Sequence, residues 1–289
     1  MRIAVLSGKG GTGKTLVSVN LARLAGNSHY IDCDIEEPNG HLFFKPALTQ
    51  KEEIKVKMPV VDHTKCNGCR KCIDKCRFNA MAYIYNKVLI FEEVCHSCGA
   101  CSLLCPEKAI SESDKVIGEI QHGTSDMVKV SSGFLNIGES SGIPVIRQLL
   151  KQKTGTNNVI IDCPPGSACS VMESIQDADF CLLVAEPSIF GAHNLNMVYE
   201  LVKLFNKKHA VVLNKTMEGE NPSEEFCQTH LIPILSRIPY SQEIAKQNSD
   251  AEIIIDTNPQ YRELFAQLLE NIKKEPLVRT GISDKSGIF

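Results

Sequence analysis

The chain has 289 residues, a formal net charge of −3, 43% hydrophobic residues and 13 cysteines. The hydrophobic content excludes a disordered chain and is ample for a sizeable core in one or two domains. The nearly balanced charge gives no positive field of the kind used to bind nucleic acid or anionic membranes, so neither partner is expected. Residues 1–6 lack a signal-peptide pattern, so we expect a cytoplasmic protein whose cysteines are metal ligands or reduced thiols.

The first predicted strand, residues 2–7, is followed by a glycine-rich loop and by a helix predicted over residues 14–26. The loop reads GKGGTGKT and has the strand, loop and helix order that a P-loop requires. Lys14 can reach the β- and γ-phosphates of a nucleotide, and the hydroxyl of Thr15 can ligate Mg²⁺. The predicted nucleotide-binding residues of this segment are Gly8, Lys9, Gly10, Gly11, Thr12, Gly13, Lys14 and Thr15.

Acidic residues end two of the predicted strands. Residues 30–33 form the second strand, with Asp32 near its end and Asp34 just after it. The apolar strand at residues 158–162 ends in Asp162, which is typical of a Walker B aspartate that holds Mg²⁺. We expect Asp34 to orient an attacking water and Asp32 to be structural. The alternative is that these carboxylates only cap the ends of their strands.

A cysteine-rich segment interrupts the chain after the second strand. It contains the spacing Cys-x2-Cys-x2-Cys-x3-Cys twice, which is the spacing of bacterial ferredoxins. In that spacing the fourth cysteine binds the cluster of the other motif, so two 4Fe-4S clusters with crossed ligand sets are expected. Zinc is the competing metal, but zinc sites favour two cysteine pairs with a longer spacer. The predicted sets are Cys66, Cys69, Cys72 and Cys105 for the first cluster, and Cys95, Cys98, Cys101 and Cys76 for the second.

The remaining segments complete an α/β pattern. Short extended pieces are expected at residues 118–120 and 127–136, a helix at 143–151, and buried strands at 180–185 and 210–213. This alternation predicts a mostly parallel, doubly wound sheet with helices on both faces. The predicted organisation is an ATPase domain over residues 1–57 and 115–289, interrupted by a small α+β ferredoxin-like domain over residues 58–114. A helix at 261–272 is expected to pack on the core rather than on a membrane.

The residues that follow the predicted strand at 210–213 indicate which base the nucleotide carries. Asn214 and Lys215 resemble the start of the guanine-reading motif of GTPases, but position 217 is Met and lacks the required carboxylate. Adenine is therefore favoured, with Asn214 expected to contact the base. ATP, Mg²⁺ and the two 4Fe-4S clusters are the predicted cofactors.

Some residues allow two interpretations. Lys65, Arg70, Lys71, Lys75 and Arg77 surround the first cysteine motif. They either dock an acidic redox partner or form a solvated face. Cys169 either joins a site between two subunits or is a buried inert thiol, and burial is the expected state. His96, between two cysteine ligands, is expected at the surface.

Lys9 lies inside the glycine-rich loop, and in this position it resembles the deviant Walker A motif of the MinD/ParA and nitrogenase iron protein group. Residues 32–39 (DCDIEEPN) and 185–191 (AEPSIFG) resemble MinD-superfamily ATPases that contain an inserted ferredoxin domain. The resemblance implies a homodimer that sandwiches two ATP molecules, with Lys9 reaching the nucleotide of the facing subunit. Lys9, Lys14 and Asp34 are then the catalytic residues.

These features support more than one function. The first hypothesis is an ATP-driven dimer switch coupled to electron transfer or to metallocluster assembly, with an unidentified redox or cluster-accepting protein as partner. The alternative is a MinD/ParA-like positioning switch whose clusters sense redox state. A third interpretation makes the clusters structural staples only.

Overall fold

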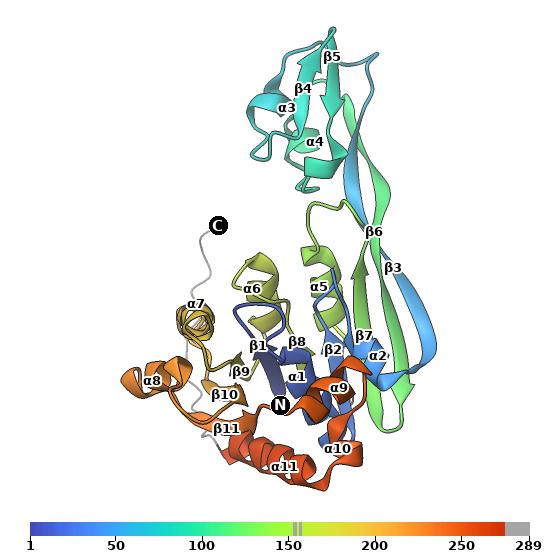
Figure 1. Ribbon diagram of the computed structural model, residues 1–289. Helices are drawn as coiled ribbons and strands as arrows, with labels where there is room; N and C mark the ends of the chain where they lie inside the picture. Colours follow the sequence, from blue (N-terminus) through green and yellow to red (C-terminus); the bar gives the residue numbers. More distant parts are fainter. Residues whose placement is uncertain (153–154, 156–157, 275–289) are drawn as a thin grey trace.

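A nine-stranded sheet runs through the computed structural model, which describes residues 1–152, 155 and 158–274 (Figure 1). The strand order is β11-β10-β9-β1-β8-β2-β7-β6-β3. The strands from β11 to β7 are all parallel, whereas β6 and β3 at one edge are antiparallel to their neighbours. The strands are β1 (Arg2–Leu6), β2 (Ser28–Asp32), β3 (Ala47–Val61), β6 (Ile110–Ser125), β7 (Val128–Leu135), β8 (Asn158–Asp162), β9 (Phe180–Ala185), β10 (His209–Thr216) and β11 (Ile234–Pro239). The predicted mostly parallel α/β sheet is confirmed.

Helices cover both faces of this sheet, because its central strands are apolar on both sides. In β1, Ala4 and Leu6 face one core while Ile3 and Val5 face the other. The first core is closed by α5 (Ile143–Leu150), α6 (Cys169–Ile175), α7 (Ile189–Leu204) and α8 (Pro222–Thr229). The second is closed by α1 (Lys14–Leu24), α2 (Gly40–Phe44), α9 (Gln242–Ser249), α10 (Ile254–Thr257) and α11 (Pro259–Lys274).

The C-terminal helix packs on the core as predicted. Phe265, Leu268, Leu269 and Ile272 of α11 are buried against the second core. Within the described residues, no helix combines the length and apolar character that a membrane span needs. The tail at residues 277–289 is mixed in charge and short of apolar periodicity, which disfavours a membrane-binding tail, and it lies outside the described residues.

The strands β3 and β6 extend beyond the sheet as a long antiparallel arm. Their pairing runs from Ala47 opposite Thr124 to Val61 opposite Ile110. Only the half of β6 from Gly118 onward also pairs with β7. In β3 and β6, only residues 118–120 were predicted to be extended, so most of both strands was missed. The free part of the arm is a two-stranded ribbon, and at its start Ile54, Val56 and Met58 alternate with charged residues, but this alternation is too short to predict strands of the observed length.

The cysteine-rich segment forms a separate module at the far end of this arm (Figure 1). It contains α3 (Lys71–Asp74), β4 (Met81–Ile84), β5 (Lys87–Ile90), a 3-10 turn (Glu92–Val94) and α4 (Ala100–Leu104). The predicted domain boundaries fall opposite each other in the arm, where Lys57 pairs with Asp114 at 2.6 Å. The division into two domains stays a prediction.

Hydrophobic packing inside the module is limited. Its buried apolar cluster consists of Cys72, Met81, Val88 and Ile110, with further cysteines packed at the edge. A module of this size with so small a core has little hydrophobic stabilisation of its own and needs covalent or metal cross-links. All thirteen cysteines of the chain lie within the described residues, and each is a free thiol, so disulfides do not provide them.

Candidate functional site

The glycine-rich loop between β1 and α1 is held in shape by its own side chains. Ser7 Oγ and Thr12 Oγ1 donate hydrogen bonds to the carbonyl oxygen of Lys9, at 2.8 and 3.1 Å. Gly13 has φ +99°, a left-handed conformation that favours glycine. A Cβ at Gly8 would lie 2.2 Å from the backbone oxygen of Asn194 in α7. The loop therefore packs directly on a neighbouring helix and tolerates no side chain at this point.

Two residues at the carboxyl end of β10 support the same loop from the other side. Asn214 Nδ2 donates to the carbonyl oxygen of Thr12 at 2.8 Å, and Lys215 Nζ donates to that of Gly11 at 2.8 Å. Asn214 is buried beneath the loop and lies outside the lining of the adjoining pocket. The structure thus gives Asn214 a role in holding the loop, and its contact with adenine stays a prediction.

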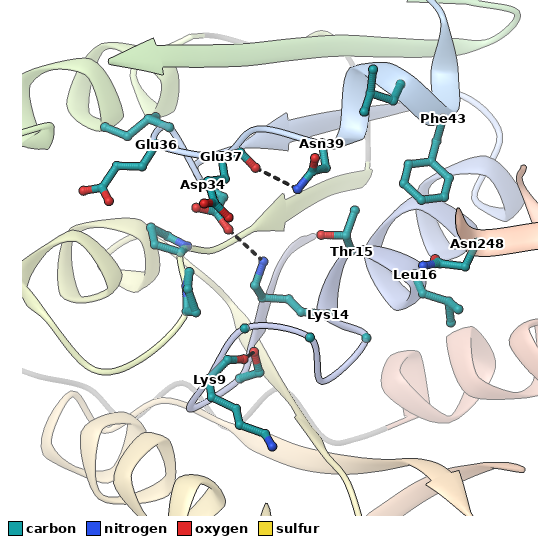
Figure 2. A pocket seen from close by; sticks show the side chains of 18 of the residues that line it. Lys9, Lys14, Thr15, Leu16, Asp34, Glu36, Glu37, Asn39, Phe43 and Asn248 are labelled. Carbon is teal, nitrogen blue, oxygen red and sulfur yellow. Dashed lines mark hydrogen bonds and ion pairs between the residues drawn. The ribbon is translucent and has the colours of Figure 1, made fainter. Parts of the chain in front are cut away.

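A group of charged side chains meets at the ends of β2 and β8, beside the loop. Lys14 Nζ donates to Asp162 Oδ1 at 2.8 Å and lies 3.7 Å from Asp34 Oδ2. Tyr30 OH donates to the other oxygen of Asp162 at 2.8 Å. Figure 2 shows Lys14 and Asp34 facing each other at the pocket. Both predicted aspartates therefore lie next to the P-loop lysine.

Asp32 is placed differently from these two aspartates. It is fully buried, and its oxygens accept hydrogen bonds from the backbone N–H groups of Asp34 and Gly40, at 3.2 and 2.9 Å. These bonds shape the turn that follows β2 and so aim Asp34 toward Lys14. This is the structural role expected of Asp32.

Burial and mutual repulsion perturb the carboxyl groups of the site. Burial raises the pKa of Asp34 to about 6, with Lys14 opposing the shift and Asp162 adding to it. Burial likewise raises the pKa of Asp32, and the charge of Asp162 adds to the effect. Burial disfavours the charge on Lys14, but Asp162 and Asp34 outweigh it and raise its pKa. Lys14 is the cation that balances these carboxylates, so a bound phosphate would compete for it and free Asp162 for Mg²⁺.

A cavity of about 780 Å³ opens beside this charged group and is large enough for a nucleotide. Thr15, Asp34 and most of the glycine-rich loop line one side of it. Its other walls come from segments that the sequence analysis did not single out. They include Leu42 and Phe43 of α2, Gly142 before α5, and Asn248, Ser249 and Ala251 at the end of α9. These residues carry no recognisable motif, and only the fold brings them to the site.

Lys9 points away from Lys14, as Figure 2 shows. Its ammonium group forms an ion pair with Glu186, in the turn that follows β9. Lys215 lies 3.6 Å from the second oxygen of Glu186. Lys9 is half-exposed, and its ion pair holds it within its own chain. The family resemblance, in contrast, implies that Lys9 reaches the nucleotide of a facing subunit.

The module's cysteines surround two small cavities. Among other residues, the first is lined by Cys66, Cys69, Cys72 and Cys105, and the second by Cys76, Cys95, Cys98 and Cys101, with Cys72 at its edge. Each group thus combines three cysteines of one motif with the fourth of the other. The fourth cysteines also accept backbone hydrogen bonds, Cys76 Sγ from Ala80 and Cys105 Sγ from Ala109, each at 3.3 Å.

These cysteines do not converge on a point. In the described part of the chain, no three His, Cys, Asp or Glu side chains gather closely enough to hold a single metal ion. The two 4Fe-4S clusters therefore stay a prediction.

The structure settles the positions of the residues with two interpretations. Cys169 is exposed at the first position of α6, so the expectation that it is buried is wrong. It lies there because α6 begins at the pocket edge, where Ala168 and Ser170 line the cavity. His96 is exposed, as expected, and stacks on Phe78 with ring centroids 4.0 Å apart.

The basic residues around the first cysteine motif are all exposed. Lys65 pairs with Asp62 at 3.1 Å, and the guanidinium of Arg70 lies 4.6 Å from the centre of the Tyr83 ring. Both interpretations of this surface, a docking site and a solvated face, remain open.

Comparisons with known proteins find relatives that are similar in sequence. An uncharacterized protein of Methanocaldococcus jannaschii is 29% identical over 279 residues, which cover 95% of this chain and 97% of that protein. Hydrogenase-4 component A of Escherichia coli is 27% identical over 132 residues, covering 43% of this chain and 60% of that protein.

Among solved structures, the septum site-determining protein MinD of Pyrococcus horikoshii, complexed with Mg-ADP, superposes with a TM-score of 0.60 at 18% identity. The superposition covers 94% of this chain and 96% of that one, and at this identity it shows a shared fold. The family model described as CobQ/CobB/MinD/ParA nucleotide binding domain matches residues 3–254. The chain therefore belongs to the CobQ/CobB/MinD/ParA family of nucleotide-binding domains.

Proposed function

We propose that the chain is a Mg²⁺-dependent ATPase that works as a dimeric switch, and that its cysteine module holds two 4Fe-4S clusters for exchange with a partner protein. The exchange is of electrons or of a metallocluster. The observation that carries the proposal is the pairing, in one chain, of a P-loop cavity with two crossed groups of four cysteines.

The nucleotide part of the proposal assigns each charged residue a task. Lys14 leaves Asp162 to neutralise the β- and γ-phosphates, and Thr15 and Asp162 hold Mg²⁺. Asp34, once ionised, orients the water that attacks the γ-phosphate. Its position 3.7 Å from Lys14 keeps it beside the expected γ-phosphate.

Dimer formation is the step that involves Lys9. In the single chain Lys9 pairs with Glu186. It must leave this partner to neutralise charge on the nucleotide of a facing subunit, so closure of the dimer and completion of the catalytic site are one event. Hydrolysis removes the γ-phosphate, whose negative charge attracts Lys9 across the interface, and the dimer can then open.

The cysteine groups fit 4Fe-4S clusters for three reasons. The first cavity combines three cysteines of one motif with the fourth of the other, and the second does the same with Cys72 as a further lining residue. Backbone N–H groups donate to Cys76 Sγ and Cys105 Sγ, which holds these two side chains in place beside the cavities. The module's small apolar core leaves room for a stabilising group. Bound clusters of this kind supply one-electron transfer.

The exposure of two cysteines in the module supports exchange of electrons or of a metallocluster with another protein. Cys69 and Cys98, one from each group, are exposed, so a partner can approach either site closely. The partial similarity to a hydrogenase component favours a redox partner over a purely structural role for the cysteines.

The test starts with anaerobic purification and chemical analysis, which should find about eight iron and eight sulfide per chain. ATP hydrolysis is then measured with the protein reduced and oxidised, with and without EDTA. We expect Mg²⁺-dependent hydrolysis whose rate differs between the two redox states. Absence of iron and sulfide, or identical rates together with reduction potentials that ATP leaves unchanged, would overturn the proposal.

A second candidate is a positioning switch, favoured by the MinD-like fold over 94% of the chain. In this function the ATP cycle controls location and the clusters report redox state. Sedimentation with anionic liposomes discriminates between the two. ATP-dependent pelleting supports the positioning switch, and protein that stays in the supernatant with ATP supports the exchange function.

A further inference from the structure

A short loop touches both the nucleotide cavity and the second cysteine group. We call residues 136–142, between β7 and α5, the bridge loop. Figure 1 shows it rising from the sheet toward the cysteine module. Gly142 at its end lines the nucleotide cavity, and Ser140 Oγ donates a hydrogen bond to the carbonyl oxygen of Cys95 at 3.0 Å.

The nucleotide end of the bridge loop is tightly packed. A Cβ at Gly142 would lie 1.9 Å from Cδ1 of Ile35, so the Ile35 side chain fills the space beside this glycine. Leu135 N donates to the carbonyl oxygen of Ile35 at 2.9 Å. Ile35 follows Asp34 and also lines the cavity. Any movement of the Asp34–Ile35 backbone on nucleotide binding therefore pushes on both ends of the bridge loop.

The module end is held by polar contacts instead. Besides the hydrogen bond from Ser140, Glu139 is nearly buried and pairs with Lys115 of β6 at 3.2 Å. The same lysine lies 3.7 Å from Glu92, in the turn that precedes Cys95. A cavity of about 250 Å³ lies beside this contact, lined by residues 139–141 of the bridge loop on one side and by residues 95–98 on the other. The bridge loop therefore holds the Cys95–Cys98 segment through the Ser140 hydrogen bond, and the cavity leaves space for this segment to move.

We propose that Ser140 is a positioning residue that links the nucleotide state to the backbone of the Cys95–Cys98 segment. Nucleotide in the cavity shifts Ile35, Ile35 shifts the bridge loop, and the Ser140 hydroxyl carries this shift to the carbonyl of Cys95. The cysteine group that contains Cys95 and Cys98 then changes its exposure to a partner with each ATP cycle. This inference rests on the proposed ATPase with two clusters and names the internal link between them.

Hydrogen–deuterium exchange on the anaerobic holoprotein tests the link directly. A non-hydrolysable ATP analogue with Mg²⁺ should change the exchange rate of amides 95–98 in the wild-type protein. Ser140→Ala should abolish this change while nucleotide affinity and iron content stay at wild-type values. Ser140→Thr keeps the hydroxyl and should restore it.

Ser111→Ala is the matched control. The Ser111 hydroxyl donates to the carbonyl of Val60 within the arm, at 3.5 Å, and does not touch the nucleotide-binding body. This variant should respond to the analogue like the wild type.

Three results separate the inference from the function on which it rests. A wild-type protein that binds ATP and iron but shows no change at residues 95–98 overturns the inference alone, as does a Ser140→Ala variant that responds normally. A wild-type protein that contains no iron or binds no ATP overturns the proposed function, and the inference falls with it.

Discussion

Lys9 and Glu186 form an ion pair within one chain, although Lys9 is the residue that family resemblance assigns to the facing subunit. Glu186 is largely buried, and burial opposes its charge, but Lys9 and Lys215 hold its pKa below the ordinary value. Lys215 is already within 3.6 Å, so Glu186 keeps a counter-ion when Lys9 leaves. In the proposed dimer, this pair is therefore a contact that has to break.

The first prediction concerns the cost of breaking this pair. Glu186→Gln releases Lys9, and an ion pair of this partly exposed kind is worth about 0.5–1 kcal/mol. Two such pairs break for each dimer that forms, so ATP-dependent self-association should tighten by roughly 5–30-fold, measured by analytical ultracentrifugation with a non-hydrolysable ATP analogue.

Two comparisons check the first prediction. Glu200→Gln removes the partner of Lys203 on the exposed side of α7 and should leave association unchanged. Lys9→Ala should bind ATP and remain monomeric. Association that weakens in Glu186→Gln would show instead that Glu186 orients Lys9 for the dimer.

The second prediction compares two glycines of the same loop. A Cβ at Gly8 would meet the backbone oxygen of Asn194 at 2.2 Å, whereas a Cβ at Gly10 would meet no atom within 4 Å. Gly8→Ala should therefore displace the loop from α7 and lower the free energy of unfolding by roughly 1–3 kcal/mol. Gly10→Ala should leave the free energy of unfolding within about 0.5 kcal/mol of wild type. Urea denaturation without nucleotide measures both, and equal stability of the two variants contradicts the packing.

The third prediction is a pH dependence that comes from Asp34. Its pKa is about 6 in the folded chain, and about 3.9 is the ordinary value for an unfolded one. A raised folded pKa means that the stabilising contribution is fully present below about pH 4 and is lost as the pH rises to about 6. Relative to Asp34→Asn, the wild-type protein should lose at most about 3 kcal/mol of unfolding free energy across this range.

The measurement is urea denaturation of both proteins without nucleotide or Mg²⁺, at several pH values. Comparison with Asp34→Asn cancels other titrating groups, such as buried His29, whose pKa is lowered to about 4 by burial and which acts in the opposite direction. A difference between the two proteins that stays constant with pH would mean that the pKa of Asp34 is the same in the folded and the unfolded chain.

The fourth prediction tests the crossed cysteine groups. Cys105 lies with the first motif and Cys76 with the second. Cys105→Ser should therefore change the same electron paramagnetic resonance signal as Cys66→Ser, and Cys76→Ser the same signal as Cys95→Ser. Each variant should lose up to half of the iron. Cys169→Ser, outside both groups, should keep both signals, and pairing of Cys76 with Cys66 in the spectra would refute the crossed arrangement.

Local patterns explain how much of this protein can be predicted from sequence. The strands β8 and β9 were predicted at their observed bounds, because buried parallel strands are unbroken apolar runs. Asp162 was placed near Lys14 because parallel strands bring their carboxyl ends to one edge. The arm was missed although Ile54, Val56 and Met58 alternate with charged residues, because this alternation covers only a short part of two strands that are otherwise mostly polar.

The amino-acid sequence by itself determined the glycine-rich loop, the spacing of the cysteines and the class of the sheet, because each depends on residues close together in the chain. The tertiary structure alone decided that Lys9 pairs with Glu186, that Asn248 and Ser249 wall the cavity, that Cys169 is exposed and that Ser140 reaches Cys95. These contacts join residues from different elements, and which of them meet depends on the order of the strands and the packing of all the helices together.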